Sequence, residues 1–566
     1  MEYEDVLRQY LGEFGRYQKL AAVLIVLVGP SVGATMFAQA FVAATPRHHC
    51  RIYKNDSTAT YGHPSERLTF SVPMEKVEDT WKYSSCLMYS GTDGRSTWNN
   101  QTVTCIHGWE YDQTVYHSTI VTEYDLVCGR HWLKELGQSI FMVGVSAGGL
   151  ISGLTSDRFG RRPTVLTCIV LQLTAGLTAA FVKNYVTFLI LRLLVGGAAN
   201  GVFYTGLTLA MEVVGSSKRN AVGMTISLSW SVGIVFLGGL AYFLRDWWTL
   251  QLALALMSVP HLTYFWLLPE SPRWLLSNNR AKKAKISIQK AAKMNKVTIP
   301  DDVSDKVTKP KEKEPGEKSK KYSLIDLFRG PSLRTITITM SAVWFATVAV
   351  YFALVIGSAD LAGDPYLNFV LSSLLEIGLC LVSLVAMEKW GRRPVVGGFL
   401  FLTGAACLAV AATPEERQDV IRYISLFGRC AIGVTFATLS VYTPEVFPTV
   451  VRTMGLGVAN MSSRVGGILS PFVSLLVDVW PPLPMLVFGV LSTLGGAAVF
   501  RLPETFAIPL PDTLEDAENL GRKQKAEIDK TEKRSESEGD HDNFSYIGPA
   551  VVSGDVSQNN DFFNQT

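Results

Sequence analysis

Long apolar runs alternate with shorter polar segments along the chain, from residue 20 to residue 502. A helix needs about 20 apolar residues to cross a hydrocarbon core about 30 Å thick, so runs of this length predict membrane-spanning helices. The predicted spans are residues 20–44, 136–155, 164–182, 186–210, 222–244, 248–268, 335–357, 365–387, 395–412, 421–443, 455–477 and 483–502. The pattern predicts an all-α membrane protein with twelve transmembrane helices in two sets of six. Buried helices of a large soluble protein are the alternative, and twelve such runs argue against it.

Basic residues in the short loops predict the orientation, because such loops lie on the cytoplasmic side of a membrane. They place both termini, residues 1–19 and 511–566, in the cytoplasm. The first half, residues 20–274, and the second half, residues 335–510, are then joined by a cytoplasmic linker, residues 275–334. The first run is too long for a cleavable signal sequence and is expected to remain as a span.

Two charged segments are expected to build no core of their own. Residues 278–321 are dense in lysine and acidic residues and predict a solvated linker; contact of its basic start with anionic lipid is the alternative. The tail after Pro511 is charged and then rich in asparagine and serine, which predicts disorder.

The polar segment between the first two spans, residues 45–135, has the composition of an extracellular loop. It holds four of the eight cysteines, an even number that indicates disulfides and allows three connectivities. It also holds two glycosylation sequons, which together with the cysteines predict a plasma membrane location. The disulfide candidates are Cys50, Cys86, Cys105 and Cys128, and the glycosylation candidates are Asn55 and Asn100.

Several motifs occur twice in register. The sequence "SDRFGRRP" begins at Ser156 and "MEKWGRRP" at Met387, so that Gly391 follows Gly160 by 231 residues. Glu212 and Glu445, like Arg219 and Arg452, are 233 residues apart, and "PESPR" precedes "PET" by 234. Arg192 in "LRLLVGG" has its counterpart in Arg429 of "GRCAIG". Six helices followed by a copy of the same six predict a parallel repeat about an axis along the membrane normal.

These motifs resemble those of the major facilitator superfamily and, within it, the organic cation, carnitine and organic anion transporter family. The segments that carry the resemblance are "TIVTEYDLVCGRHW", "SDRFGRRP", "LAYFLRDWWTLQL", "PESPRWLLS", "IQKAAKMNK", "YTPEVFPTVVRTMGLG" and "LPETFAIPLPDTLEDAENL". The resemblance implies a secondary transporter that works by alternating access. Two features depart from relatives or from the repeat: four loop cysteines where several relatives have six, and Glu388 where the first repeat has Asp157.

The resemblance further implies that the paired motifs latch the two halves together on the cytoplasmic side. Gly153 would permit close helix contact, while acid and guanidinium groups exchange partners as the halves move. Ion pairs at a water boundary contribute only about 0–1 kcal/mol each, which suits a latch that must open. The gating residues are Asp157, Arg161, Arg162, Glu212, Arg219, Glu270, Glu388, Arg392, Glu445, Arg452 and Glu504. The alternative is that the arginines only set the topology.

Charged residues inside a span are costly and therefore indicate function. Glu376 lies about 18 Å from the inner end of its predicted helix and Arg464 about 16 Å into its own, which predicts equal depth near the middle of the membrane. Trp344 and Tyr351 are seven residues apart and share a helix face. Aromatic rings beside a carboxylate suit an organic cation, and in relatives the matching residues line the cation site. The predicted substrate-binding residues are Trp344, Tyr351, Glu376 and Arg464.

Arg464 is the residue that complicates a purely cationic site. Cation-selective relatives carry aspartate here, whereas carnitine-type and anion-type relatives carry arginine. With Glu376, it would suit a substrate with both an ammonium and a carboxylate; the alternative is a structural arginine, paired with a helix C-terminus or with Glu376 itself. A dedicated anion carrier would keep a second base in the eighth helix, where this chain has Cys380.

The leading hypothesis is therefore a transporter of small organic cations or zwitterions across the plasma membrane. An organic anion exchanger and a non-transporting, receptor-like relative are the alternatives. The sequence contains no nucleotide-binding loop, metal-ligand cluster or catalytic Ser/His/Asp arrangement, so it predicts neither an enzyme nor a cofactor. The net charge of +3 does not point to nucleic acid. Glu445 could serve sodium or proton coupling as well as gating.

Overall fold

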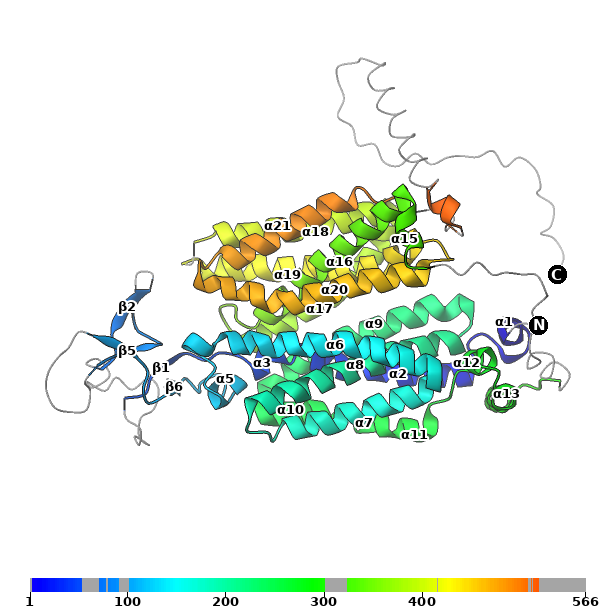
Figure 1. The fold of residues 1–566 in the computed structure, drawn as a ribbon, viewed down its shortest axis with the longest axis horizontal. Helices are drawn as coiled ribbons and strands as arrows, with labels where there is room; N and C mark the ends of the chain where they lie inside the picture. The colour runs from blue at the N-terminus through cyan, green and yellow to red at the C-terminus, as the bar shows by residue number, and fades with distance from the viewer. Residues whose placement is uncertain are drawn as a thin grey trace, which may run out of the picture.

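The protein is an elongated bundle of helices with a small strand-containing domain at one end (Figure 1). The computed structural model describes residues 3–52, 71–77, 80–90, 101–300, 323–414, 416–506, 511 and 513–518. Both predicted glycosylation sites, Asn55 and Asn100, lie outside these residues. We call the end with the strands the disulfide end, and the opposite end, where the two GRRP motifs lie, the motif end.

The first half contains the first six predicted spans. They correspond to α2 (Arg16–Phe37) with α3 (Gln39–Val42), α6 (Trp132–Phe159), α7 (Arg161–Ala179), α8 (Tyr185–Val213), α9 (Ser216–Phe243), and α10 (Trp247–Leu256) with α11 (Tyr264–Leu267). The sixth predicted span, residues 248–268, is broken rather than continuous. Pro260 lacks the N–H that an α-helix requires, and it begins the short 3-10 helix η3 (Pro260–Thr263).

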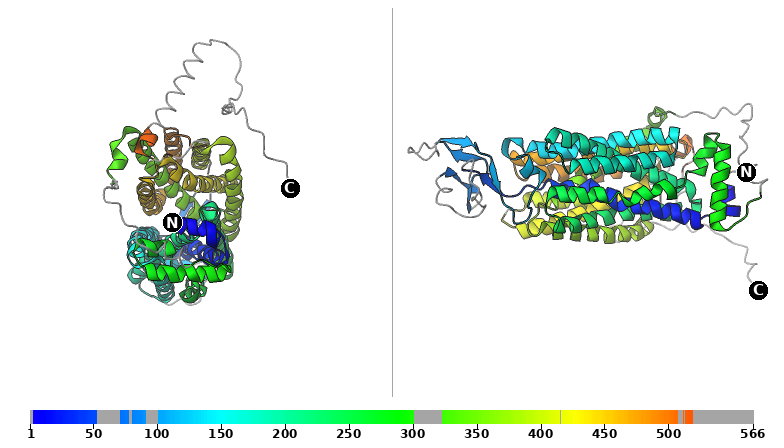
Figure 2. Two further views of the ribbon diagram at one scale, coloured as in Figure 1. Left: turned by 90° about the vertical axis from the view of Figure 1, so that its right-hand side faces the viewer. Right: turned by 90° about the horizontal axis from the view of Figure 1, so that it is seen from below.

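The second half repeats this arrangement. Its helices are α16 (Pro331–Gly357), α17 (Pro365–Trp390), α18 (Arg392–Ala412), α19 (Gln418–Val446), α20 (Arg452–Ser474), which continues as the 3-10 helix η4 (Leu475–Asp478), and α21 (Leu483–Val499). Within the described residues, nine helical segments are long and apolar enough to cross a membrane, and α7, α20 and α21 occupy the other three predicted positions. The two halves lie side by side as separate layers (Figures 1 and 2).

Helix starts follow the local sequence. Asp364 accepts a hydrogen bond from the Leu367 amide and so caps α17, and Pro365 occupies the first helical position, where no amide donor is needed. Asn184 caps α8 in the same way through the amides of Val186 and Thr187. These caps fix where the polar connections end and the apolar helices begin.

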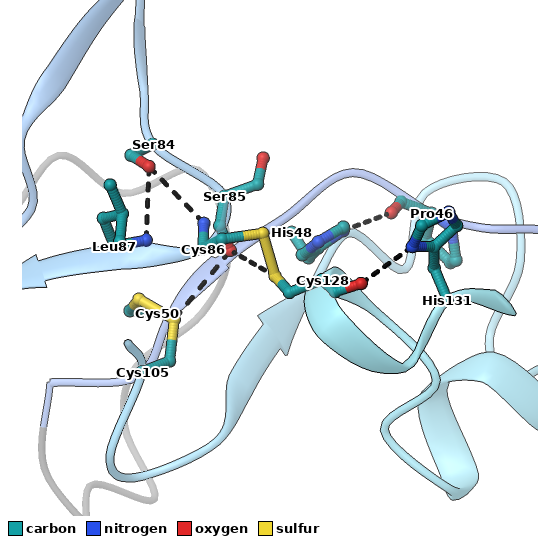
Figure 3. Close-up of a disulfide and its surroundings, with 10 residues drawn as sticks. All are labelled: Pro46, His48, Cys50, Ser84, Ser85, Cys86, Leu87, Cys105, Cys128 and His131. Atoms are coloured by element: carbon teal, nitrogen blue, oxygen red, sulfur yellow. Dashed lines mark hydrogen bonds between the residues drawn. A yellow bond between two sulfur atoms is a disulfide. The ribbon is translucent and has the colours of Figure 1, made fainter. Parts of the chain in front are cut away.

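The strand-containing domain holds both disulfides. Its strands are β1 (His48–Cys50), β2 (Met74–Val77), β3 (Thr80–Tyr83), β4 (Leu87–Tyr89), β5 (Thr102–Thr104) and β6 (Trp109–Tyr111). They form three antiparallel pairs: β1 with β6, β2 with β3, and β4 with β5. Of the three possible connectivities, the structure has Cys50–Cys105 and Cys86–Cys128 (Figure 3). Short helices α5 (Ile120–Glu123) and η2 (Cys128–Arg130) lead from this domain into α6.

The start of the linker differs from its prediction. Residues 278–321 were expected to build no core, but α12 (Pro272–Ser277) is followed by α13 (Ala281–Asn295), which buries Ala284, Ile288, Ala291 and Ala292. These positions fall on one side of a helix, so the many lysines occupy the remaining faces. Asn295 anchors the end of α13 by accepting a hydrogen bond from the Tyr17 amide, at 2.8 Å.

Both terminal segments contain short helices, and in the tail this differs from the prediction. The short helices α1 (Tyr3–Val6) and η1 (Leu7–Leu11) pack against the first half. Residues 514–518, in the tail expected to be disordered, are helical. Glu518 accepts hydrogen bonds from the amides of Ser332 (3.1 Å) and Leu333 (3.2 Å), and so caps α16, which follows the short helix α15 (Asp326–Arg329).

Candidate functional site

Glu376 is a buried carboxylate in the middle of α17, with 5% of its surface exposed. The hydroxyl of Tyr351 donates a hydrogen bond to its Oε1, at 2.9 Å. Its Oε2 has no hydrogen-bond partner within the described part of the chain. The neighbouring helix α19 comes close because it has glycine at position 433; a Cβ there would lie 2.7 Å from the Glu376 carboxyl carbon. The result is a half-satisfied carboxylate inside the helix bundle.

An aromatic cluster lies beside this carboxylate. Phe436 stacks on Tyr351, with ring centroids 5.3 Å apart, and meets Trp344 edge-on at 5.5 Å. The two residues predicted to share a helix face therefore contact the same ring. Trp344 also donates a hydrogen bond to Thr443 Oγ1, at 2.8 Å. Phe37 from the first half packs edge-on against Tyr351 at 5.9 Å, which places this cluster where the two halves meet.

Arg429 is a fully buried cation close to Glu376, although its sequence pattern predicted only a landmark of the repeat. It interacts electrostatically with Glu376 without forming a salt bridge among the described residues. Its guanidinium instead donates to the hydroxyls of Ser358, Ser372 and Ser373 and lies over the Phe369 ring. The signal in the sequence was an arginine within an apolar run, which is costly in a membrane.

The counterpart in the first half, Arg192, has a neutral environment. It is also fully buried and donates to Gln39 Oε1 at 2.9 Å, while its guanidinium lies over Phe141. No carboxylate forms a salt bridge with it among the residues that the structure describes. Among the residues that the structure describes, only the second half therefore combines a fully buried arginine with a buried carboxylate.

Arg464 is half-buried on α20 and reaches across to the first half. Its Nη2 donates to the hydroxyl of Tyr204 on α8, at 3.1 Å, and its guanidinium lies 5.6 Å from the centre of that ring. In this conformation Arg464 is not paired with Glu376, so a structural ion pair between these two residues is excluded here. The residue bridges the two halves.

The predicted equal depth of Arg464 and Glu376 differs from the structure. Helices α16 and α20 run in parallel, with Ser462 bonded to the Ser341 carbonyl and Ser470 to the Ala349 carbonyl. Along α16, Arg464 is thus level with about residue 343, whereas Glu376 is bonded to the side chain of Tyr351, further along the same helix. Arg464 therefore lies roughly one to two helical turns nearer the motif end. Counting along each helix from its predicted end could not reveal this offset.

Most of the predicted gating residues of the first half form one network. Arg161 bonds to Asp157 Oδ1 and to Glu212 Oε1, both at 2.8 Å. Glu270 Oε1 accepts the backbone amides of Arg161 (3.0 Å) and Arg162 (3.3 Å), and thereby caps α7. Burial raises the pKa of the Glu270 carboxyl, while these amide hydrogen bonds act in the opposite direction. The position before Arg161 and Arg162 requires glycine, because Gly160 has a φ of +119° and a Cβ there would lie 2.4 Å from a Glu270 oxygen.

The second half reproduces this network. Arg392 bonds to Glu445 at 3.1 Å, and Glu504 accepts the amides of Arg392 (2.9 Å) and Arg393 (3.0 Å). Gly391 again has a positive φ, +88°, against the capping glutamate. Each GRRP tetrapeptide thus binds a capping glutamate in the same way, Glu270 in the first half and Glu504 in the second. This shared contact explains why the motif occurs twice.

The remaining gating candidates are less alike. Arg219 donates to Glu4 and to the Met211 carbonyl, whereas Arg452 donates to the Phe447 carbonyl. Glu388 is exposed, and no salt bridge joins it to a base within the described ranges, unlike its counterpart Asp157. The second network, which has Glu388 in place of aspartate, thus lacks a counterpart of the Asp157–Arg161 pair in this conformation.

Contacts between the halves gather toward the disulfide end. Ser139 on α6 donates to the Ile468 carbonyl on α20, at 2.8 Å. Phe41 stacks on Tyr366, and His131 Nε2 lies 2.8 Å from Asp478 Oδ2. By contrast, the motif end of α6 is uncovered: Leu154 is 75% exposed, and a Cβ on Gly153 would meet no atom within 4 Å. The close helix contact expected at Gly153 is therefore absent from this conformation.

His48 lies beside Cys86 and Cys128 at a spacing that resembles a metal site. Because the two sulfurs are bonded to each other, they are not available as thiolate ligands, and the cluster does not fit a metal ion. The other cysteines (Cys168, Cys380, Cys407 and Cys430) are free and lie within helices of the bundle.

Comparison with known proteins identifies the family. A family model described as "Sugar (and other) transporter" matches residues 87–515. The "Organic cation transporter protein" of Drosophila melanogaster is 37% identical over 92% of this chain and 96% of its own. "Solute carrier family 22 member 1" of Oryctolagus cuniculus is 34% identical over 92% of this chain and 96% of its own. "Organic anion transporter 3" of Pongo abelii is 34% identical over 94% of this chain and 98% of its own.

A solved structure shows the same fold. The inward open conformation of the xylose transporter XylE from E. coli has a TM-score of 0.57 and covers 88% of this chain and 98% of its own, at 14% identity. The all-α fold and the paired motif networks define a major facilitator transporter, a multi-pass membrane protein for small molecules rather than an enzyme. The chain belongs to the organic cation, carnitine and organic anion transporter family of that superfamily.

Proposed function

We propose that the protein transports small organic cations or zwitterions, with Glu376 as the residue that binds the ammonium group. The observation that carries this proposal is the buried Glu376 carboxylate, with one oxygen held by Tyr351 and the other left without a partner among the described residues. A buried carboxylate is costly unless a cation compensates it. Arg429 supplies part of that compensation from a distance, and a substrate ammonium at Oε2 would supply the rest.

The aromatic cluster and Arg464 suggest which organic cations fit. Rings of Trp344, Tyr351 and Phe436 beside the carboxylate offer cation–π contacts to an ammonium, at about 0.5–2 kcal/mol each. Arg464 lies further toward the motif end, with its guanidinium on the other half. A substrate with its carboxylate several bonds from its ammonium, as in carnitine-like betaines, would span that offset.

We further propose that this conformation is open to the cytoplasm and closed to the outside. The halves are joined near the disulfide end by Ser139 with Ile468 and by His131 with Asp478. At the motif end each arginine network bonds within its own half, and Gly153 faces open space. Alternating access would require the motif end to close and the contacts at the disulfide end to break.

Asp157→Asn is expected to slow transport several-fold, with little change in the substrate concentration for half-maximal uptake. Asp157 is 74% exposed at its side chain and pairs with Arg161 at the motif end, remote from the Glu376 cluster. Its removal would therefore change the movement of the halves rather than substrate binding. Uptake kinetics normalised to surface protein test this, with the exposed Asp419→Asn as control. A normal maximal rate with greatly weakened binding would contradict the gating role.

The disulfide-bonded domain is proposed to be extracellular, which makes the protein a plasma membrane transporter with both termini in the cytoplasm. We expect Asn55 and Asn100 to carry glycans, so that glycosidase treatment lowers the apparent mass. The double variant Asn55→Gln, Asn100→Gln should abolish this shift. Labelling of the domain only from the cytoplasmic side would reverse the proposed topology.

An organic anion exchanger is the second candidate, because Arg464 is a fixed cation at the interface of the halves. The experiment that separates the two is uptake of labelled tetraethylammonium, carnitine and p-aminohippurate in the same expressing cells, with and without sodium. Uptake of the first two supports our proposal, and uptake of p-aminohippurate alone would replace it with anion exchange. The sodium-free arm tests whether sodium couples to transport.

A further inference from the structure

A basic pocket lies outside the proposed transport path, at the motif end of the first half. Its volume is about 350 Å³, and its walls come from α2, α6, α7, α11, α12 and α13. Tyr17 and Ser287 lie within its lining, and Phe159, Trp266 and Ile286 contribute apolar side chains. The linker helix α13 thus completes a cavity that the transmembrane helices alone would leave open.

The pocket is basic. Arg162, Arg280, Lys283 and Lys290 line it, with Glu270 as the one acidic residue in the lining. Glu270 is already engaged by the amides of Arg161, Arg162 and Ser271. No carboxylate forms a salt bridge with Arg280, Lys283 or Lys290 among the described residues, and Nε of Arg162 is buried without a hydrogen-bond partner there. Three net positive charges therefore face a cavity that has free donors.

One face of α13 points into this cavity. Lys283, Ile286, Ser287 and Lys290 are spaced by three or four residues, as one helix face requires, and all line the pocket. The helix lies across the end of the bundle rather than along it (Figure 2). An amphipathic helix with lysines, placed across the ends of transmembrane helices, has the geometry of a segment at the membrane surface.

Exposed apolar residues mark the same surface as the membrane boundary. Trp266 is 76% exposed, and Phe159 and Ile286 are also exposed at the pocket. Tryptophan collects where hydrocarbon meets headgroups, so the pocket mouth lies at headgroup depth. Basic pockets beside transmembrane helices on the cytoplasmic side are suited to anionic lipid headgroups.

We propose that this pocket binds the phosphorylated headgroup of an anionic phospholipid of the inner leaflet. The phosphates would contact Lys283, Lys290 and Arg280, and the acyl chains would leave past Trp266. The leaflet follows from the proposed orientation, whereas the binding itself does not depend on which substrate is carried. Because Arg162 belongs both to the pocket and to the GRRP motif, a bound headgroup would join the linker helix to that motif.

Binding can be measured on the full-length protein by native mass spectrometry, which counts bound lipid. The probe is phosphatidylinositol 4,5-bisphosphate, titrated against the protein in neutral detergent with phosphatidylcholine as the reference lipid. Lys283→Glu with Lys290→Glu is expected to weaken binding more than about tenfold. The matched control, Lys282→Glu with Lys293→Glu, makes the same charge change on the same helix outside the pocket and should weaken it less than about threefold.

The milder pair Lys283→Gln with Lys290→Gln should shift binding in the same direction by a smaller factor, which guards against misfolding of the charge-reversed variant. Equal losses in the pocket and control variants would show general surface attraction and overturn the site. So would a pocket variant that binds as well as the wild type. Soluble inositol trisphosphate tests the source: binding as tight as that of the lipid, unaffected by Trp266→Ala, would mean a soluble phosphate and contradict the lipid assignment.

Discussion

Glu376→Gln is expected to weaken the uptake of every small organic cation by roughly 10- to 100-fold in apparent affinity. The estimate follows from a charge-assisted hydrogen bond of about 1.5–3 kcal/mol, lost where solvent cannot replace it. Glutamine keeps the size of the side chain and can still accept the Tyr351 hydroxyl, so packing against Gly433 is preserved. The change therefore removes the charge while leaving the shape of the site almost unaltered.

The measurement is concentration-dependent uptake of tetraethylammonium in cells, normalised to surface protein. Glu416→Gln is the matched control, because this exposed glutamate of the same half lies outside the aromatic cluster. Glu376→Asp keeps the charge on a shorter side chain and should retain part of the affinity. Unchanged affinity in Glu376→Gln, with the control also unchanged, would exclude Glu376 from substrate binding.

Arg464→Asp is expected to separate zwitterions from simple cations. The change removes the cation that would hold a substrate carboxylate and places an anion in the same region. A betaine should therefore lose more than about tenfold in apparent affinity, as expected for a charge-assisted contact. A permanent monocation should be transported as well as before, or better, because a repulsive charge has gone. The Tyr204 hydroxyl loses its donor but remains half exposed, so the structural cost is small.

The test compares carnitine with tetraethylammonium in the same surface-matched variants. Arg417→Asp, at an exposed site before α19, makes the same charge change away from the interface of the halves and serves as control. Equal loss of both substrates in a folded protein would mean that Arg464 serves the contact between the halves through Tyr204. In that event the zwitterion hypothesis fails, while the role of Glu376 stands.

The sequence predicted the fold well because membrane spans are encoded locally. A helix that crosses lipid must be predominantly apolar over about 20 residues, so its position can be predicted from local composition. The repeated GRRP motif was also recognisable, since each copy needs a glycine at positive φ and a capping glutamate, here Glu270 and Glu504. The interruption at Pro260 was missed because the run is predominantly apolar on both sides of the proline, and length and composition alone predict one span.

Features that depend on packing between distant segments were not predictable in this way. The lysine content of α13 concealed its apolar stripe, although Ala284, Ile288 and Ala291 are spaced for one helix face. The pairing of the four cysteines depends on how β1, β4 and β5 fold around them, which spacing does not determine.

In the candidate site, too, the features encoded locally were predictable and those that depend on packing were not. The aromatic pair and Glu376 were predictable from their spacing and from the cost of a buried charge. The height of Arg464 relative to Glu376 required the register of α16 and α20. Arg429 was not predicted as a site residue, because Arg192 occupies the matching position of the first half and the sequence does not show that only Arg429 lies near a buried carboxylate.

The central claim is that the protein carries organic cations through a site built on Glu376. The most direct test is uptake of tetraethylammonium by purified protein in liposomes with an inside-negative potential, compared with Glu376→Gln and Glu416→Gln. We predict accumulation with the wild type and Glu416→Gln, and almost none with Glu376→Gln. Transport of p-aminohippurate but not tetraethylammonium by the wild type, or equal tetraethylammonium uptake by all three proteins, would contradict the account.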